Sequence, residues 1–350
     1  MIAAEDGSGD AGDVFLAARG AGGPLWGQAG WDGEWILRPG WRLLCRFAPN
    51  GLAAARSRDG LFGFVARDGS WAVEPRFRNA GSFSAVGLAA AETPDGTGFV
   101  DSSGAWAVEP RFLEARPFSA SGLAPAREIS DALSPLWGVV DAKGAWRVRP
   151  GFAELAFHYD SRGLAAARDP GTGLAGFLTE EGVWAVPPKF LDLGPFAGAG
   201  LAPARAGNGL WGAVDLSGGW AVKPSFAGLR PFSASGLAGA RDPSGHWGVV
   251  GPDGRWAVLP TFANVGGAFS GPFAGGGLAP ASSGEGLWGF IDREGRWAVE
   301  PVFAAVYPFF GTGVTAAMDR DGLWGVLDGA GGWTAMPGFA EVALFPPPAG

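Results

Sequence analysis

One short pattern recurs along this chain and constrains its fold more than any other feature. It reads Leu-Trp-Gly, two apolar residues and Asp, then a turn that ends in Gly, and then Trp-Ala-Val-x-Pro, as in residues 287–301. The second tryptophan of the pattern returns at intervals of 35 to 41 residues, at Trp35, Trp71, Trp106, Trp146, Trp184, Trp220, Trp256, Trp297 and Trp333. Such a period predicts an array of repeated supersecondary units.

Each unit is expected to contain three strands. A Gly-Leu-Ala segment, the Trp-Gly segment and the Trp-Ala-Val segment are short, apolar and bounded by turn residues, which favours strands over helices. Between the last two, Asp292 and Gly295 are the first and fourth turn residues. Asp bonds turn amides and Gly accepts a positive φ, so we expect a type I turn with a Gly bulge. Pro301 should end its strand or lie on a sheet edge, because it cannot donate to a ladder.

The segment after the third strand also repeats, with two phenylalanines such as Phe303 and Phe309. We expect these to pack one unit onto the next, because a unit this small cannot bury both of its faces alone. The prediction is an all-β tandem array of nine short antiparallel β-meander units. An open twisted stack is favoured, and a propeller-like closure, with the connecting segment as a fourth strand, is the alternative.

The expected domain organisation is a short disordered tail at 1–12 followed by one repeat domain at 13–350. The units span approximately 13–50, 51–86, 87–121, 122–162, 163–199, 200–235, 236–276, 277–312 and 313–350. The fourth and seventh units carry insertions at 128–135 and 266–271, which are either a binding surface or tolerated variation in loop length.

The phrase Trp-Gly-Phe-Ile-Asp-x-x-Gly-x-Trp-Ala-Val-x-Pro-x-Phe, followed by Phe-Ser-x-x-Gly-Leu-Ala, resembles the bacterial WG-containing repeat. The resemblance covers roughly residues 13–345. Three units depart from it, with Phe62, Thr97 and Ala175 in place of the first tryptophan. The resemblance implies a β-repeat fold and an interaction role, and it supplies no catalytic residue to transfer.

Charge and composition exclude several classes of partner. A net charge of −8 and a pI near 4.9 disfavour binding to nucleic acid. The sequence has no polybasic run for an anionic membrane surface and no apolar stretch of transmembrane length, so membrane insertion is not expected. Because residues 1–12 also lack the features of a signal peptide, we expect a cytoplasmic location.

Two sets of repeated side chains are candidates for a ligand surface. Tryptophan rows could stack on sugars, although a residue repeated in most units more often packs in the core. Arginines that end the first strands could bind carboxylates. The favoured interpretation is that they pair with turn aspartates such as Asp141 and Asp215, or simply solvate the ends of their strands. The candidates are Trp137, Trp211, Trp247, Trp288, Trp324, Arg127, Arg168, Arg205 and Arg241.

No catalytic, metal or cofactor site is expected. His158 and His246 have no second ligand at metal-binding spacing, and Cys45, the single cysteine, has no histidine nearby in sequence. We therefore expect a non-catalytic scaffold that binds a protein or peptide. The alternative is a module that binds carbohydrate or the cell envelope, with a possible polysaccharide ligand. Exposed tryptophans would favour the alternative, and buried tryptophans the scaffold.

Overall fold

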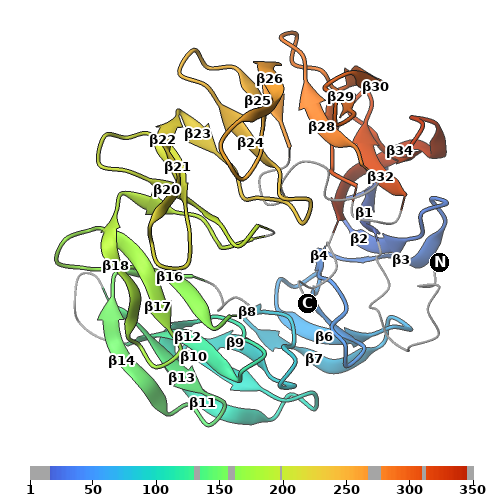
Figure 1. The fold of residues 1–350 in the computed structure, drawn as a ribbon. Coiled ribbons are helices and arrows are strands. Elements are labelled where there is room, and N and C mark those ends of the chain that lie inside the picture. The colour runs from blue at the N-terminus through green and yellow to red at the C-terminus, as the bar shows by residue number, and fades with distance from the viewer. Residues whose placement is uncertain are drawn as a thin grey trace, which may run out of the picture.

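The computed structural model describes residues 16–129, 135–156, 162–197, 199–266, 277–309 and 313–344. Throughout these ranges, every regular element is a β-strand, and each strand pairing is antiparallel. Figure 1 shows the units arranged as a ring, in which the first strands, in blue, lie beside the last strands, in red. The prediction of an all-β array of nine antiparallel meanders is confirmed. The predicted tail at 1–12 lies outside the described residues.

Three long strands form the body of each unit, in the predicted order. The first strands are β1 (Leu16–Gly20), β5 (Leu52–Arg56), β9 (Ala89–Thr93), β12 (Leu123–Glu128), β16 (Leu164–Arg168), β20 (Ala202–Arg205), β24 (Ala238–Arg241), β28 (Ala279–Ser282) and β32 (Val314–Met318). The middle strands are β2 (Trp26–Ala29), β6 (Phe62–Ala66), β10 (Gly96–Val100), β13 (Trp137–Asp141), β17 (Ala175–Thr179), β21 (Trp211–Val214), β25 (Trp247–Val250), β29 (Trp288–Ile291) and β33 (Trp324–Asp328). The third strands are β3 (Trp35–Trp41), β7 (Trp71–Phe77), β11 (Trp106–Ala115), β14 (Trp146–Phe152), β18 (Trp184–Phe190), β22 (Trp220–Phe226), β26 (Trp256–Phe262), β30 (Trp297–Phe303) and β34 (Trp333–Leu344).

The connecting segment supplies a fourth, two-residue strand, which pairs with the first strand of the following unit. These short strands are β4 (Leu43–Leu44), β8 (Asn79–Ala80), β15 (Glu154–Leu155), β19 (Asp192–Leu193), β23 (Gly228–Leu229), β27 (Asn264–Val265) and β31 (Ala305–Val306). A typical sheet therefore has the order β27-β28-β29-β30, and we call it a blade. Blades 1 to 9 are numbered by their first long strands. In β11 and β34 the third strand continues into the short strand without a break, which joins two blades into one seven-stranded sheet.

The two ends of the repeat array meet in one sheet. Strand β1 pairs with β2 on one side and with the end of β34 on the other, in the register Leu16↔Leu344 to Arg19↔Glu341. The C-terminal strand thus supplies the fourth strand of blade 1, and the ring is closed. The favoured open stack is therefore corrected to the propeller-like alternative. The sequence pattern of one unit does not predict the angle between successive units. That angle determines whether the first and last units of the array meet.

The glycine of the Trp-Gly motif allows a bulge in the third strand. Trp288 pairs with Phe303 and Phe290 with Val299, so the third strand carries extra residues around Pro301. A Cβ on Gly289 would lie 2.4 Å from the carbonyl oxygen of Val299. Strand β30 continues past Pro301 to Phe303, so the proline does not end it. The strand is at the edge of its sheet, which is the other position predicted for this proline. Proline and a bulge on this free edge oppose pairing with further strands.

The Asp-x-x-Gly turn has the predicted geometry. The amide of Gly295 donates to the carbonyl of Asp292 at 3.0 Å, and Gly295 has a φ of +80°. One carboxylate oxygen of Asp292 accepts hydrogen bonds from the amides of Glu294 and Arg296, at 3.0 and 2.9 Å. Side-chain capping by Asp and the positive φ of Gly together hold the turn.

The turn glycine also touches the preceding blade, which the sequence did not indicate. A Cβ on Gly254 would lie 2.6 Å from Cγ1 of Val222, the central valine of the preceding third strand. The same contact, at 2.4–2.8 Å, recurs at Gly104–Val73, Gly144–Val108, Gly182–Val148, Gly218–Val186, Gly295–Val258 and Gly331–Val299. These glycines therefore set how closely successive blades approach.

We expect Gly254→Ala to lower the free energy of unfolding by about 1–3 kcal/mol more than Gly236→Ala. Both glycines have nearly the same φ, +77° and +78°, so both alanines incur a similar backbone cost. Only Gly254 has a side chain of the preceding blade in its path, since Gly236 has nothing within 4 Å. Urea denaturation of the two variants measures the difference. Equal losses of unfolding free energy in the two variants would show that the close contact between Gly254 and Val222 does not restrict the side chain at position 254.

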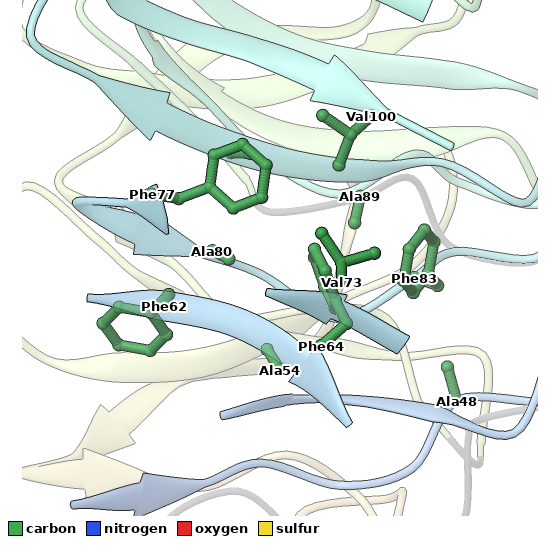
Figure 2. Packing of buried hydrophobic residues seen from close by; sticks show 11 residues of the cluster. Ala48, Ala54, Phe62, Phe64, Val73, Phe77, Ala80, Phe83, Ala89 and Val100 are labelled. Carbon is green, nitrogen blue, oxygen red and sulfur yellow. The ribbon is translucent and has the colours of Figure 1, made fainter. Parts of the chain in front are cut away.

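The hydrophobic core lies between blades as well as within them. Figure 2 shows the cluster around Phe64, in which Val73 and Phe77 of blade 2 face Ala89 and Val100 of blade 3. Phe83, from the connecting segment, packs on Phe64 with ring centroids 4.6 Å apart. The prediction that the connecting phenylalanines pack one unit onto the next is confirmed. The same packing recurs in the pairs Phe99–Phe118, Phe177–Phe196 and Phe290–Phe309.

Candidate functional site

The second tryptophan of the repeat packs between blades. Trp256 of blade 7 meets Phe226 of blade 6 edge to face, with ring centroids 5.5 Å apart and an angle of 83° between the rings. Seven further interfaces carry the same pair at 5.4–5.6 Å, formed by Trp35–Phe339, Trp106–Phe77, Trp146–Phe112, Trp184–Phe152, Trp220–Phe190, Trp297–Phe262 and Trp333–Phe303. This row of aromatics is therefore structural.

The candidate tryptophans of the Trp-Gly motif do not form an open ladder. Trp137 is buried, at 3% exposure, whereas Trp211, Trp247, Trp288 and Trp324 are half-buried. Cations cover two of these rings. The guanidinium of Arg116 lies 3.9 Å from the ring centroid of Trp137, and that of Arg230 lies 4.6 Å from the ring centroid of Trp247. In blade 9, Tyr307 packs on Trp324, with centroids 5.3 Å apart.

Three of the four candidate arginines lie opposite these tryptophans, and all four donate to backbone carbonyls. Arg127, Arg205 and Arg241 are the cross-strand partners of Trp137, Trp211 and Trp247, respectively. Their guanidinium groups donate to backbone carbonyls, namely Arg127 to Pro135, Arg168 to Gly173, Arg205 to Gly209 and Arg241 to Ala227.

Of the two favoured interpretations of these arginines, the pairing with turn aspartates is wrong. Arg205 pairs with the start of the middle strand of its blade, whereas Asp215 follows the end of that strand, so the two residues lie at opposite ends of the blade. The Asp215 carboxylate instead accepts hydrogen bonds from the backbone amides of Ser217 and Gly219, at 2.9 and 3.0 Å. Asp141 likewise accepts the amides of Lys143 and Ala145.

At one end of the blades, three of the nine loops depart from the common length. We call this end the loop face, defined by the loops between first and middle strands, which follow the arginines and precede the tryptophans. In six blades this loop has five residues, at 21–25, 57–61, 206–210, 242–246, 283–287 and 319–323. In blades 3, 4 and 5 it spans 94–95, 129–136 and 169–174, respectively. The predicted insertion at 128–135 thus falls on this face, and its residues 130–134 lie outside the described residues. Of the other predicted insertion, at 266–271, only the first residue is described.

Blade 5 has a pocket where other blades carry a tryptophan. Ala175 is the cross-strand partner of Arg168, the place that Trp211 occupies opposite Arg205. Ala175 and Arg168 line a pocket of about 350 Å³, together with Arg116, Glu154 and Asp192. Sequence reasoning noted Ala175 only as a departure from the repeat and missed Glu154 and Asp192, which belong to the short strands β15 and β19.

Charges at this pocket compensate one another. Arg168 Nε lies 2.9 Å from a carboxylate oxygen of Glu154, and Arg168 Nη2 lies 3.7 Å from one of Asp192. Arg168 also donates to the carbonyls of Gly173 and Leu191, at 2.8 and 3.1 Å. The guanidinium of Arg116 donates to the carbonyl of Leu155 in blade 5. The pocket is therefore lined by paired ions and by small apolar side chains.

In the part of the chain that the structure describes, the cysteine, the turn aspartates and His246 lie apart from one another. Burial raises the pKa of the Cys45 thiol to about 11, so the thiol form dominates at neutral pH. A hydrogen bond from the Ser217 hydroxyl lowers the pKa of Asp215, and one from the Ser103 hydroxyl lowers the pKa of Asp101. Both carboxylates are therefore ionised at neutral pH and stabilise their turns. His246 Nδ1 lies 2.9 Å from Ser244 Oγ in an exposed loop, and His158 lies outside the described residues.

The part of the chain that the structure describes contains no group of three or more His, Cys, Asp or Glu side chains that could hold a metal ion. It also contains no helix long and apolar enough to cross a membrane.

Comparison with family models identifies the repeat. A model described as "WG containing repeat" matches residues 62–93, 98–128, 211–242 and 288–333. These matches lie in blades 2, 3, 4, 6, 7, 8 and 9, and each includes strands of the Trp-Gly or Trp-Ala-Val type. A comparison with curated proteins found no match.

Comparison with solved structures shows similarity at the level of the fold. A structure titled "Crystal structure of the eukaryotic initiation factor" aligns over 94% of this chain and 96% of its own, with a TM-score of 0.63 and 11% identity. BamB from Moraxella catarrhalis aligns over 87% of this chain and 85% of its own, with a TM-score of 0.40 and 14% identity. Hsv2p from Kluyveromyces lactis aligns over 62% and 74%, with a TM-score of 0.38 and 10% identity.

Proposed function

This chain belongs to the WG containing repeat family, and we propose that it is a non-catalytic scaffold that binds a protein or peptide partner on its loop face. The observation that carries the proposal is where the units differ. The loops of blades 3, 4 and 5 depart from the common length on this face. At the opposite end, the turns between middle and third strands keep one form, and one connecting loop, 266–278, is longer than the others. Loops that vary on a rigid repeat frame are where such proteins usually bind.

The packing of the tryptophans supports a protein partner over a carbohydrate. Stacking on a sugar requires an open aromatic face, but Trp137 is buried and Trp247 is covered by Arg230. The second tryptophans are engaged with phenylalanines of the preceding blades, as in Trp256–Phe226. Eight of the nine second tryptophans therefore contact a neighbouring blade.

The free edges of the blades disfavour binding by strand addition. Each third strand carries a proline at its fifth residue, as at Pro224, Pro260 and Pro301, within a bulge that interrupts the ladder. Proline offers no amide to an added strand, and the bulge distorts the edge. The expected partner therefore binds through side chains and loops on a face of the ring.

Pull-down with loop-exchange variants tests the proposal. In the first variant, residues 169–174 of blade 5 are replaced by residues 206–210 of blade 6, which keeps an equivalent bond from arginine to a loop carbonyl. In the control, residues 242–246 of blade 7 receive the same replacement. A tagged wild-type protein is presented in parallel to a soluble lysate and to insoluble envelope polysaccharide.

We expect wild type and the blade 7 control to retain the same few proteins, and the blade 5 variant to retain them at least about tenfold less, with unchanged melting temperatures. The tenfold loss corresponds to about 1.4 kcal/mol of binding free energy. Co-sedimentation with polysaccharide, released by soluble sugar, would instead favour the carbohydrate function. Equal protein retention by all three forms would remove the loop face from the proposal.

A further inference from the structure

Resting on this proposed function, we infer that the pocket in blade 5 receives an aromatic side chain of the partner protein, at the place where most other blades hold their own tryptophan. Ala175 supplies no ring at that place, and the first and middle strands around it keep the register that they have in blade 6. The pocket lies against Ala175 and Arg168. The expected occupant is thus an aromatic ring, because a tryptophan side chain stands at this position in most other units of the repeat.

The structure of the neighbouring blades shows what belongs at this position. Opposite the first-strand arginine, blade 4 has Trp137, blade 6 has Trp211 and blade 7 has Trp247. In blades 4 and 7 the arginine also lies over the ring, with guanidinium-to-centroid distances of 5.3 Å at Arg127 and 5.9 Å at Arg241. Blade 5 keeps this arginine as Arg168 but has only a methyl group opposite it.

Other departures from the repeat are filled by the chain itself. Blade 2 has Phe62 at this position, and the ring is buried, at 8% exposure. Blade 3 has Thr97, which is also buried, at 7% exposure. Ala175 of blade 5 is also buried, at 5% exposure, and blade 5 differs in that this small side chain lines a pocket of about 350 Å³. This volume is within the range of ordinary ligand pockets and accommodates one aromatic side chain.

The charges around the pocket favour a neutral aromatic ring over an ion. Glu154 and Asp192 are held by Arg168, which also donates to two backbone carbonyls. A bound carboxylate would have to displace one of these acidic groups, and a bound cation would face Arg168 and Arg116. A ring can lie against the guanidinium without breaking these pairs, as the rings of Trp137 and Trp247 do in their own blades.

The direct test fills the pocket with the missing side chain. In Ala175→Trp the new ring takes the position that Trp211 has in blade 6, so we expect a melting temperature at or above that of wild type. The control is Ala185→Trp, which adds a tryptophan to an exposed position of the same blade and outside the pocket lining. The probes are N-acetyl-tryptophan amide and N-acetyl-tyrosine amide, with N-acetyl-leucine amide as the apolar comparison.

Saturation-transfer NMR on the full chain measures binding of the three probes. We expect wild type and Ala185→Trp to bind both aromatic amides at least about fivefold more tightly than the leucine amide, and Ala175→Trp to lose this binding. Aromatic binding that persists in Ala175→Trp, or equal binding of the leucine amide, would overturn the inference.

Repeating the pull-down with Ala175→Trp separates this inference from the proposed function. We expect Ala175→Trp to lose the partner that Ala185→Trp retains. If Ala175→Trp still retains a partner that the blade 5 loop exchange loses, the pocket is not the anchor, but the protein-binding function stands. If the aromatic amides bind in the pocket while wild type retains no protein, the proposed function falls and the aromatic specificity of the pocket remains.

Discussion

A chain shortened to residues 1–339 is expected to lose roughly 5 kcal/mol of unfolding free energy, because it lacks the strand that closes the ring. The removed part of β34 pairs with β1 from Glu341 onward and buries Val342 to 4% exposure. Burial of one valine side chain is worth about 1.5–3 kcal/mol, and each lost ladder hydrogen bond about 1 kcal/mol. The ion pair of Arg19 with Glu341, at 3.1 Å, and the hydrogen bond from Tyr307 to the Val342 carbonyl are lost as well.

The matched control is a chain shortened to residues 1–344. It keeps every residue of β34 that pairs with β1, and it should unfold in urea at the midpoint of the full chain. In the 1–339 chain we also expect amide hydrogens of β1 and β2 to exchange much faster than those of β20 and β21, since the blade that lost its fourth strand opens first. Equal midpoints for the two shortened chains would show that closure contributes little to stability.

The local structure of this protein was predictable because the residues that determine each strand and turn lie within the same repeat unit. The short apolar segments around Trp288 and Trp297 indicated two strands, and Asp292 and Gly295 indicated the turn that joins them. These features depend on residues close together in sequence. Nine repetitions of the same pattern made the prediction of an all-β array secure.

The closed ring was not predictable in the same way. Its curvature depends on contacts between blades, such as that of Gly254 with Val222, which join residues of different units. The glycine was read correctly as a turn residue, yet its second role as a point of close approach has no local signal. The pairing of Leu16 with Leu344 depends on the sum of all these small rotations.

The candidate site was only partly visible in the sequence. The arginines and tryptophans were identified as a repeated set, and the structure brings them together as cross-strand neighbours, as at Arg205 and Trp211. The pocket was missed because Ala175 was noted only as a departure from the repeat. Its signal was that Arg168 remains in place while the tryptophan opposite it is replaced by alanine. A missing large side chain in an otherwise intact repeat can be a site in itself.

The aromatic pairs between blades are the other large contribution to stability, and Phe226→Ala should cost about 3–5 kcal/mol. Phe226 is buried at 5% exposure, packs edge to face on Trp256, and belongs to a core cluster that spans blades 6 and 7. Removing the ring leaves a cavity between two blades whose spacing is fixed by the contact of Gly254 with Val222. The cavity therefore cannot close easily, which places the expected cost in the upper part of that range.

A control and a double-mutant cycle distinguish packing between blades from general loss of apolar surface. Leu259→Ala removes a side chain that is 68% exposed on the third strand of blade 7, and it should change stability by less than about 0.5 kcal/mol. In the cycle of Phe226→Ala with Trp256→Ala, we expect a coupling of about 0.5–1.5 kcal/mol, measured by urea denaturation. A coupling near zero would mean that the two rings are buried independently. The repeated second tryptophan would then be a core residue of its own blade and not the link between neighbours.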